Sequence, residues 1–574
     1  MLKFVASNSI SMNHFSKAAV VLFFFVNMYQ NVWSQEDPLF TYHLTHEMSA
    51  EEKVQMQNLT RAFIETPAPI GSVRSIAEWE PMESVLIAYD GSFGMPVSMI
   101  REMAEDCKIT VIVANASEET TVRNYFTSNS VNVAQCSFLY QNPNSWWTRD
   151  YSPWYIAVNN EEVALIDFPY NRPRPNDDNV PVIMAPALNV DLYGMNITHT
   201  GGNFMCDGYS MAASTDLVWE ENTSQTQANM RTKMLNYMGV QTYHVTADPL
   251  DDYIKHVDCW GKYLDVDKIL IAQVPVSDYR YGDFEAVANY FAQQNCSWGY
   301  PYQVIRVQEA NANQNVETPY TNSLILNHKV FVPQTGNVLD AAAITTYQQA
   351  MPGYEIIGVT SSGWYDTDAL HCRTHGVADR QMLYIRHYPL HGTYANQSSF
   401  TINAKVVSYG GSPISAGFPK LVYQQNNGAW QEVQMNLVPA TTQDYTAEIP
   451  GLDGSNEVKY YIVAQNDNLK NESHPQMGAW DPHIFNYTNT LGIDEADLQE
   501  NIQIYPNPNA GNFVLKTTFD KGSYQIFNLN GQLLNEGELQ GFRHTLSCPN
   551  LINGVYMLKV LSDGAVYTEK MIIE

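Results

Sequence analysis

The chain has 574 residues, of which 45% are hydrophobic and 16% charged, so it has enough apolar content to fold and too little charge for a disordered chain. At about 150 residues per domain, this length predicts several domains. The 60 acidic and 31 basic side chains give a net charge of -29, which argues against a general binder of nucleic acids or anionic membranes, because such binders need a basic face.

The N-terminus has the layout of a secretory signal peptide. Lys3 and Lys17 precede an apolar run from Ala18 to Val26, and modest side chains at 32–34 lead into an acidic stretch. The run is too short for a membrane span, and an acidic sequence after it disfavours a buried helix. We expect a signal peptide over 1–34, a propeptide or linker over 35–61, and a soluble mature chain.

Strand-like and helix-like runs alternate from about residue 72 to 379. The regular recurrence of this alternation along the chain favours stacked α/β modules over one doubly wound sheet. We assign these modules to residues 62–392. The predicted strands are 85–89, 109–113, 241–245, 269–272, 303–307, 324–332 and 354–359, and the predicted helices are 97–107, 227–237, 284–293 and 340–350.

Helices are no longer predicted after about residue 395. Alternating runs at 400–408, 420–425, 434–437, 445–449 and 458–464, separated by Gly, Pro and Asn turns, are typical of an immunoglobulin-like β-sandwich. We assign this domain to residues 393–488. Its sequence does not indicate a function beyond that of a spacer or folding aid.

The last residues, 493–574, predict a second small β-sandwich, with turns at Asn530-Gly531 and Asn553-Gly554. The opening Tyr505-Pro506-Asn507-Pro508, the run Gly554–Val560 and the terminal Lys570–Ile573 resemble the type A C-terminal sorting domain of the type IX secretion system. The resemblance implies recognition by that machinery and export through the periplasm and outer membrane of a Bacteroidetes-type bacterium, to the medium or the cell surface.

Seven cysteines are an odd number, so at least one thiol is expected to be free. A free thiol in an exported protein is a liability unless it is used. Each cysteine is therefore a candidate nucleophile.

Four clusters in the α/β region carry chemically useful side chains: 145–151, 253–260, 320–323 and 368–376. The first, with two Trp beside Arg149-Asp150, is by itself equally compatible with core packing around an ion pair. If the second formed a strand, His256 and Asp258 would face the same side of it.

Other readings of these clusters are weaker. A zinc site could use His256, Cys259, His371, Cys372 and His375, but their spacing fits closed zinc sites poorly. A papain-like protease lacks its local cysteine sequence and has the opposite order of Cys and His. His371 and His375 receive no role, and Asp207 is expected to be structural, in a tight turn near the glycine pair at 201–202.

Together, the motifs Trp-x-Arg-Asp, His-Val-Asp and His-Cys-x-Thr in this order resemble the pentein superfamily, and within it the Porphyromonas-type peptidylarginine deiminases and agmatine deiminases, over about residues 56–390. The resemblance implies a five-bladed pseudo-symmetric α/β-propeller, here followed by the two small all-β sandwich domains. It also implies the roles of the site residues. Cys372 would be the nucleophile, His256 the general acid/base, and Asp150 and Asp258 the two clamps on the guanidinium. Asn322 would be an assisting amide and Trp147 a substrate contact.

The chemistry accounts for these residue types. A guanidinium is planar and cationic, and two carboxylates can hold it bidentately with its central carbon facing the thiolate of Cys372. Attack, loss of ammonia protonated by His256, and hydrolysis of the covalent thiouronium by water would give citrulline. This scheme needs no metal and no redox cofactor.

The Pro-rich stretch 168–178 bears on the substrate. Arg172 and Arg174 could be solvated cations on a surface loop, but in so acidic a chain they could also form a carboxylate site, both pointing to one side if the backbone is extended. In the family resembled, the matching arginines recognise the C-terminal carboxylate of a peptide ending in arginine, and Tyr253 matches a residue that helps. A protein-arginine deiminase is therefore the leading hypothesis, with an agmatine or free-arginine deiminase and, more distantly, a non-enzymatic adhesion protein as alternatives.

Overall fold

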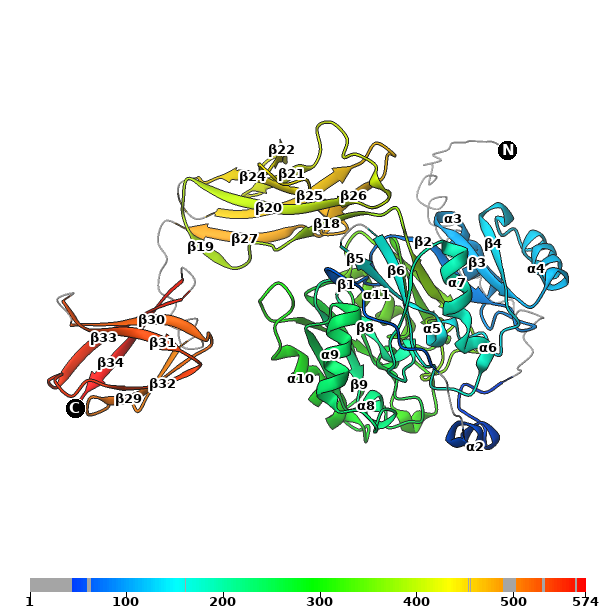
Figure 1. Ribbon diagram of the computed structural model, residues 1–574, viewed down its shortest axis with the longest axis horizontal. Coiled ribbons are helices and arrows are strands. Elements are labelled where there is room, and N and C mark those ends of the chain that lie inside the picture. Colours follow the sequence, from blue (N-terminus) through cyan, green and yellow to red (C-terminus); the bar gives the residue numbers. More distant parts are fainter. Residues whose placement is uncertain are drawn as a thin grey trace, which may run out of the picture. The chain divides into compact units, whose positions relative to one another are not determined.

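The computed structural model describes residues 44–58, 63–159, 162–452, 454, 456–488, 502–528, 532–562 and 565–574 (Figure 1). The predicted signal peptide and the Asn530-Gly531 turn lie outside these residues, as do 35–43 and 59–61 of the predicted propeptide. The chain divides into two compact units, the first made of Met1–His391, Phe400–Ile449 and Val458–Ile484, and the second of Gly392–Ser399, Pro450–Glu457 and Phe485–Glu574. No helix in the described part is long and apolar enough to cross a membrane.

The described α/β region contains five small sheets. Their strand orders are β1-β5-β6-β7, β10-β9-β8, β11-β12-β13, β14-β15-β16 and β17-β2-β3-β4. The strands are β1 (Val73–Ser75), β2 (Met82–Ala88), β3 (Lys108–Val113), β4 (Cys136–Tyr140), β5 (Trp154–Val158), β6 (Glu162–Asp167), β7 (Leu192–Gly194), β8 (Met205–Cys206), β9 (Met211–Thr215), β10 (Thr242–Thr246), β11 (Gly261–Tyr263), β12 (Lys268–Gln273), β13 (Gln303–Gln308), β14 (Leu324–Leu326), β15 (Lys329–Gln334), β16 (Glu355–Thr360) and β17 (His375–Ala378).

Helices cover these sheets (Figure 1). α3 (Val97–Asp106) and α4 (Ala116–Ser128) pack on β3, and α7 (Val180–Leu188) packs on β6. α9 (Gln227–Met238) contacts β1, α10 (Tyr281–Ala292) contacts β12, and α11 (Asp340–Ala350) contacts β16. Shorter helices are α5 (Thr148–Tyr151), α6 (Pro175–Asp178) and α8 (Leu217–Glu220), and α2 (Ala50–Asn58) precedes the first sheet.

Apolar runs predicted the central strands correctly because these strands are buried on both faces. Val85, Leu86 and Ile87 in β2 have no exposed surface, and β2 pairs in parallel with β3, which pairs in parallel with β4. The predicted helices match α3, α9, α10 and α11 to within a few residues.

One predicted element is wrong, and one conformation considered for a motif is not observed. The run 324–332 is not one strand but the antiparallel hairpin β14–β15, which turns at Asn327, where the backbone has a left-handed φ of 54°. Residues 256–260 are not a strand either: Val257–Cys259 form a single 3-10 turn. At 324–332, apolar residues on both sides of a tight turn resemble one strand, and periodicity alone does not reveal the turn.

The α/β region leads directly into a β-rich region. β18 (Leu383–His387) pairs with β20 (Ser399–Ser408), and β21 (Lys420–Gln425) pairs with both β22 (Gln431–Gln434) and β25 (Asn456–Gln465). Burial alternates along β25, so one face of this strand is covered. The remaining strands are β19 (Thr393–Ala395), β23 (Asn436–Leu437), β24 (Asp444–Pro450), β26 (Asn471–His474) and β27 (His483–Thr488).

The C-terminal residues form two further sheets, with the orders β28-β29-β32 and β31-β30-β33-β34. Phe513 and Leu515 of one sheet share a core with Ile526 and Leu558 of the other. The strands are β28 (Ile502–Tyr505), β29 (Asn512–Thr517), β30 (Lys521–Asn528), β31 (Leu533–Gln540), β32 (Arg543–Ser547), β33 (Gly554–Ser562) and β34 (Ala565–Ile573).

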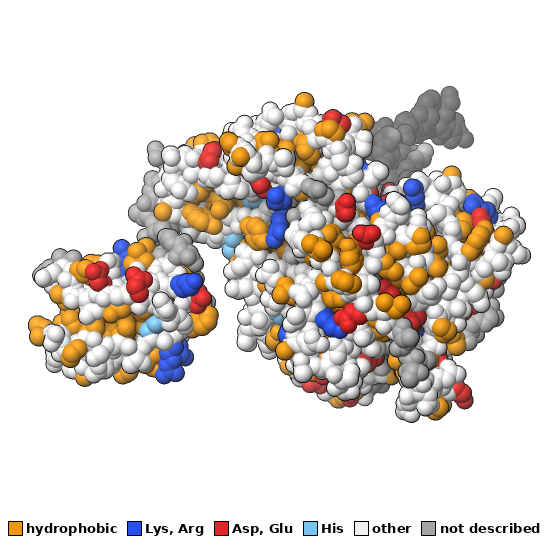
Figure 2. Space-filling model, in the orientation of Figure 1, with side chains coloured by type: hydrophobic (Ala, Val, Ile, Leu, Met, Phe, Trp, Pro, Cys, Tyr) orange, Lys and Arg blue, Asp and Glu red, His pale blue; other side chains and the backbone are white. Residues whose placement is uncertain are grey.

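Charged side chains are scattered over the surface. On the face drawn in Figure 2, Lys and Arg lie in small groups beside Asp and Glu and do not form a continuous basic surface.

Candidate active site

The short helix α5 positions the first predicted cluster. The backbone N–H of Arg149 donates to the carbonyl of Cys372 at 3.1 Å, and the hydroxyl of Thr148 donates to the carbonyl of Leu86 at 3.2 Å. These bonds join the helix to β2 and to the chain segment of the predicted nucleophile. Asp150 is consequently buried beside that segment, with 1% of its surface exposed.

His256 precedes the 3-10 turn Val257–Cys259 and Asp258 lies within it, and both are buried. The Nδ1 atom of His256 lies 3.7 Å from Oδ1 of Asp150. Neither ring nitrogen of His256 has a hydrogen-bond partner among the described residues. An unpartnered, fully buried imidazole is costly in a folded protein unless a ligand or water completes it, so His256 is suited to proton transfer.

The third and fourth clusters meet at Cys372. The Oδ1 atom of Asn322 accepts hydrogen bonds from the backbone N–H groups of His371 and Cys372, at 3.1 and 3.4 Å. These contacts fix the orientation of the amide, so Nδ2 faces the sulfur and donates to Sγ at 3.3 Å. Trp146 and Trp147 pack against Cys372. Asn322 is therefore placed to stabilise negative charge on the thiol.

Burial and charge set the ionisation of the site. Burial alone would raise the pKa of Asp150, but His256 and His46 hold it below its usual range. Burial lowers the pKa of His256 to about 4, against the opposing effect of the two aspartates. Burial also raises the pKa of the Cys372 thiol, an effect that the surrounding carboxylates reinforce and the Cys259 thiol opposes. Without substrate, Cys372 is thus a thiol, His256 a neutral imidazole, and Asp150 and Asp258 are ionised carboxylates.

A buried network behind Asp258 was not anticipated. His371 bridges two carboxylates, with Nδ1 at 2.6 Å from Asp258 Oδ2 and Nε2 at 2.6 Å from Glu78 Oε2. Glu78 also pairs with Lys262 at 3.0 Å and Arg149 at 3.3 Å. Burial alone would raise the pKa of Glu78, but His371, Lys262 and Arg149 hold it well below its usual range.

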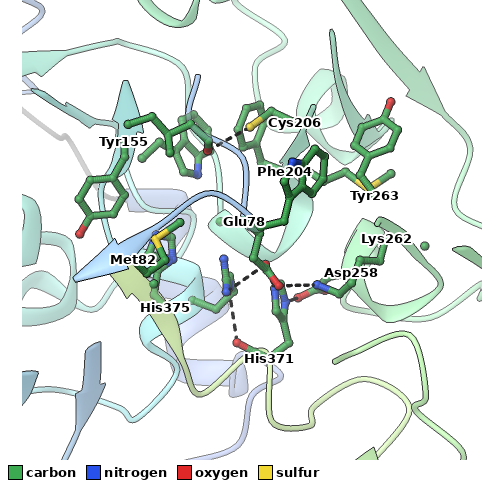
Figure 3. Close-up of a pocket in the computed structure, with 18 residues that line it drawn as sticks. Glu78, Met82, Tyr155, Phe204, Cys206, Asp258, Lys262, Tyr263, His371 and His375 are labelled. Atoms are coloured by element: carbon green, nitrogen blue, oxygen red, sulfur yellow. Dashed lines mark hydrogen bonds and ion pairs between the residues drawn. The ribbon is translucent and has the colours of Figure 1, made fainter. Parts of the chain in front are cut away.

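Figure 3 shows Glu78, Asp258, Lys262 and His371 pointing toward one another beside a cavity of about 70 Å³ that they line. The local sequence does not indicate a role for Glu78, because its partner His371 lies 293 positions further along the chain. The position of His371 beside Cys372 indicates that it lies near the site, but only the fold shows that it bridges Asp258 and Glu78.

The two loop arginines are buried rather than solvated, with 5% of Arg172 and 2% of Arg174 exposed, so the surface-loop reading is wrong. Their backbone is also not an extended strand, since it bends into α6 at Pro175. Arg174 lies over the Trp147 ring at 5.1 Å and donates to the Glu52 carboxylate at 2.9 Å. Tyr253 is the exception among the predicted site residues, with 43% of its surface exposed.

The remaining candidates do not form a second centre. Asp207 accepts three backbone N–H groups in the turn before β9, as expected for a structural residue. Among the described residues, the one group of three potential metal ligands with all ligand atoms within 4.8 Å of one another is His46, Asp368 and Cys372. The histidines and Cys259 weighed for zinc do not assemble in this way.

Comparison with known proteins identifies the family. Residues 74–377 match the model of the Porphyromonas-type peptidyl-arginine deiminases, and residues 503–574 match that of the secretion system C-terminal sorting domain. The chain belongs to this deiminase family. It is accordingly a hydrolase that acts on C–N bonds of amidines, and its sorting domain indicates secretion or a surface location in a Bacteroidetes-type bacterium.

Individual relatives carry related names. A protein of Vibrio parahaemolyticus serotype O3:K6 named "Putative agmatine deiminase" is 22% identical over 336 residues, which are 50% of this chain and 91% of that protein. An X-ray structure also described as a "putative agmatine deiminase" is 16% identical with a TM-score of 0.50, covering 55% of this chain and 99% of the other, and shares the fold. The agmatine deiminase of Enterococcus faecalis is 18% identical with a TM-score of 0.47, covering 55% and 100%.

Proposed function

We propose that this deiminase is a secreted protein-arginine deiminase that converts the C-terminal arginine of peptides to citrulline plus ammonia. The observation that carries the proposal is the environment of Arg174, which is buried, lies over Trp147 and already binds a carboxylate, that of Glu52. A buried guanidinium requires an anionic partner. A peptide ending in arginine brings such a carboxylate, whereas agmatine does not.

In this proposal, Asp150 and Asp258 hold the substrate guanidinium from two sides. Cys372 passes its thiol proton to the neutral imidazole of His256, and the resulting thiolate Sγ attacks the central carbon of the guanidinium. The C–N bond to one terminal nitrogen breaks, His256 supplies a proton to the departing ammonia, and a thiouronium remains on Cys372. Neutral His256 then takes a proton from water, whose oxygen bonds to the same carbon as the C–S bond breaks. The products are citrulline and a regenerated thiol.

The substrate itself would activate the nucleophile. In the free site, burial and nearby carboxylates raise the pKa of Cys372. A bound guanidinium offsets those carboxylates and places a positive charge near Sγ, which lowers the pKa of the thiol. The Nδ2–H group of Asn322 then donates to the thiolate. Cys372 would thus ionise mainly when its substrate is present.

The proposal includes a domain organisation: signal peptide 1–34, propeptide or linker 35–61, catalytic region 62–392, immunoglobulin-like sandwich 393–488 and sorting domain 493–574. The five sheets of the α/β region would be the five blades of a propeller around the site. The second candidate function, deimination of agmatine, is favoured by the names of the relatives and would use the same catalytic residues.

The test is product release from a peptide ending in arginine, the same peptide with arginine internal, and agmatine. We expect a strong preference for the first substrate. The double substitution Arg172→Ala/Arg174→Ala should lower kcat/KM for the C-terminal arginine by about 10- to 100-fold more than for agmatine, because charged hydrogen bonds to the carboxylate are lost only with the peptide. Tyr253→Phe should have a smaller effect of the same kind.

Arg101→Ala is the matched control, because Arg101 on α3 donates to the carbonyl of Asn129 and lies in no predicted motif. Changes in access to the site affect both substrates alike, so the ratio of their kcat/KM values isolates the carboxylate contact. Equal losses with peptide and agmatine would contradict the carboxylate role, and a preference for agmatine in the unaltered protein would favour the second candidate.

A further inference from the structure

The N-terminal segment 44–58 enters the candidate active site. The Nε2 atom of His46 lies 2.7 Å from Oδ2 of Asp150, and the imidazole is buried, with 3% exposed. Its ring stacks on Trp147, with centroids 4.7 Å apart and planes 14° apart. The ligand atoms of His46 and Cys372 are within 4.8 Å of each other. His46 therefore lies where the substrate guanidinium is expected.

The contacts of His46 are those of a cation. Its other ring nitrogen, Nδ1, lies 3.2 Å from the carbonyl oxygen of Thr367. A carboxylate and a carbonyl can only accept, so both contacts are hydrogen bonds together only when the ring is an imidazolium. An imidazolium is planar and carries N–H donors at its edge, as a guanidinium does.

The same segment supplies an anion to Arg174. Nε of Arg174 donates to Oε1 of Glu52 at 2.9 Å, and Nη2 donates to the carbonyl of Thr45 at 3.0 Å. Burial alone would raise the pKa of Glu52, but Arg174 and the N–H of Ser49 hold it below its usual range. Ser49 and Glu52 also cap α2 reciprocally, with bonds of 2.9 and 3.1 Å, which fixes the position of the carboxylate.

The segment has little else to hold it. α2 buries none of its residues, and the apolar contribution comes from Leu44, which is partly buried against the Trp146–Trp147 cluster. The segment is thus held by two charged side chains, by the stack of His46 on Trp147, by two contacts that involve the carbonyls of Thr45 and Thr367, and by Leu44. Binding through side chains of this kind, without a buried helix face, is the pattern of a ligand rather than of a structural element. The two charges are those of a peptide ending in arginine.

We infer that residues 44–58 are an intramolecular inhibitor, in which His46 takes the place of the substrate guanidinium and Glu52 takes the place of its carboxylate. The inference rests on the proposed function. The segment lies within the predicted propeptide, 35–61, so that its displacement or removal would open the site. A substrate competes with a segment whose local concentration is in the millimolar range, on the order of that for a short tether.

The test uses the full chain with His46→Ala, Glu52→Gln and the control Glu51→Gln. Glu51 is exposed in the same first turn of α2, so its variant matches the charge change but leaves Arg174 bound. We expect His46→Ala and Glu52→Gln each to raise kcat/KM for a peptide ending in arginine by about 10-fold or more, mainly through KM. Glu51→Gln should change it by less than about 2-fold.

A second readout does not depend on turnover. Alkylation of Cys372 by iodoacetamide, followed by peptide mass mapping, should be faster in His46→Ala than in the unaltered chain, because the variant lacks the imidazole that lies within 4.8 Å of Sγ. A synthetic peptide of residues 44–58 should slow it again, and the same peptide with His46→Ala should not.

The two readouts separate failure of the inference from failure of the proposed function. Faster alkylation with no product from any arginine substrate would retain the inhibitory segment and overturn the peptide-arginine assignment. Full activity in the unaltered chain, with no gain in either variant and unchanged alkylation, would overturn the inference and retain the function.

Discussion

The two clamp carboxylates, which the sequence presents as equivalent, have very different surroundings. Asp150 is bound by His46, which belongs to a segment whose helix, α2, has no buried residue. Asp258 is bound by His371, which is held in turn by Glu78 and, through it, by Lys262. One carboxylate is paired with a group that can leave, and the other belongs to the interior of the domain.

This difference suggests a division of labour. A site that binds a buried cation must keep its carboxylates ionised while the cation is absent, which is costly in a buried environment. On the Asp258 side a permanent network of buried cations meets that cost. On the Asp150 side it is met by His46, whose departure would leave a carboxylate ready for the substrate guanidinium.

Asp150→Asn and Asp258→Asn test this comparison most strongly. Each should lower kcat/KM for arginine substrates by about 1000-fold, because one side of the guanidinium loses its charged acceptor. Only Asp258→Asn should also lower the free energy of unfolding substantially, by about 3 kcal/mol, since it leaves the buried His371 network with unbalanced charge. Urea unfolding of both variants provides the measurement.

For Asp150→Asn we expect a loss of stability of about 1 kcal/mol, because His46 can move into water once its partner is gone. If the two variants were destabilised equally, segment 44–58 would be as integral to the domain as the interior network, and the comparison would fail.

Gly202 provides a sharper probe of the Asp150 side. A Cβ atom at this position would lie 2.5 Å from Nδ1 of His256 and 2.9 Å from Oδ1 of Asp150. Gly202→Ala should therefore displace both groups and lower kcat by about 10- to 100-fold, as expected for a misplacement of up to about 1 Å. Gly282→Ala on α10 is the matched control, since its Cβ would meet nothing within 4 Å. Equal activities of the two variants would show that His256 tolerates displacement.

The residues that the sequence proposes for the candidate site are concentrated in motifs. Asp150, His256, Asp258, Asn322 and Cys372 come from four local clusters, and the structure brings these clusters together. The helices and central strands were also predictable, because the hydrophobic pattern of a two-sided buried strand or an amphipathic helix is local.

What could not be predicted depends on contacts between distant residues. Glu78 and Glu52 lie in ordinary acidic contexts, and only the fold places them against His371 and Arg174. His46 belongs to a segment that the sequence suggested was only a propeptide or linker. The burial of Arg174 was missed for the same reason, since a Pro-rich string with two cations usually lies on the surface.

Lowering the pH should also distinguish the Asp150 side of the site, which includes His256, from the Asp258 side, through a smaller change in the free energy of unfolding. Burial lowers the pKa of His256 from 6.5 to about 4, so below pH 6.5 the unfolded chain binds a proton that the folded chain does not. Stability is therefore lost as the pH falls from 6.5 toward 4, by about 1.4 kcal/mol at pH 5.5 for this group. The pKa of Asp258 is lowered from 3.8 despite its burial, through its bond to His371, so its stabilising contribution is lost only below about pH 4.

The measurement is the free energy of unfolding in urea at pH 7.5 and 5.5. His256→Gln should reduce the loss between these pH values by about 1.4 kcal/mol, whereas Asp258→Asn should leave that loss unchanged, although it lowers stability at both. His387→Gln is the comparator. His387 lies in β18, outside the predicted site, and burial also lowers its pKa to about 4. This variant should flatten the pH dependence equally while retaining turnover. A His256→Gln variant with the pH dependence of the unaltered chain would mean that the pKa of His256 in the folded site equals its unfolded value, and that burial does not keep this imidazole neutral below pH 6.5.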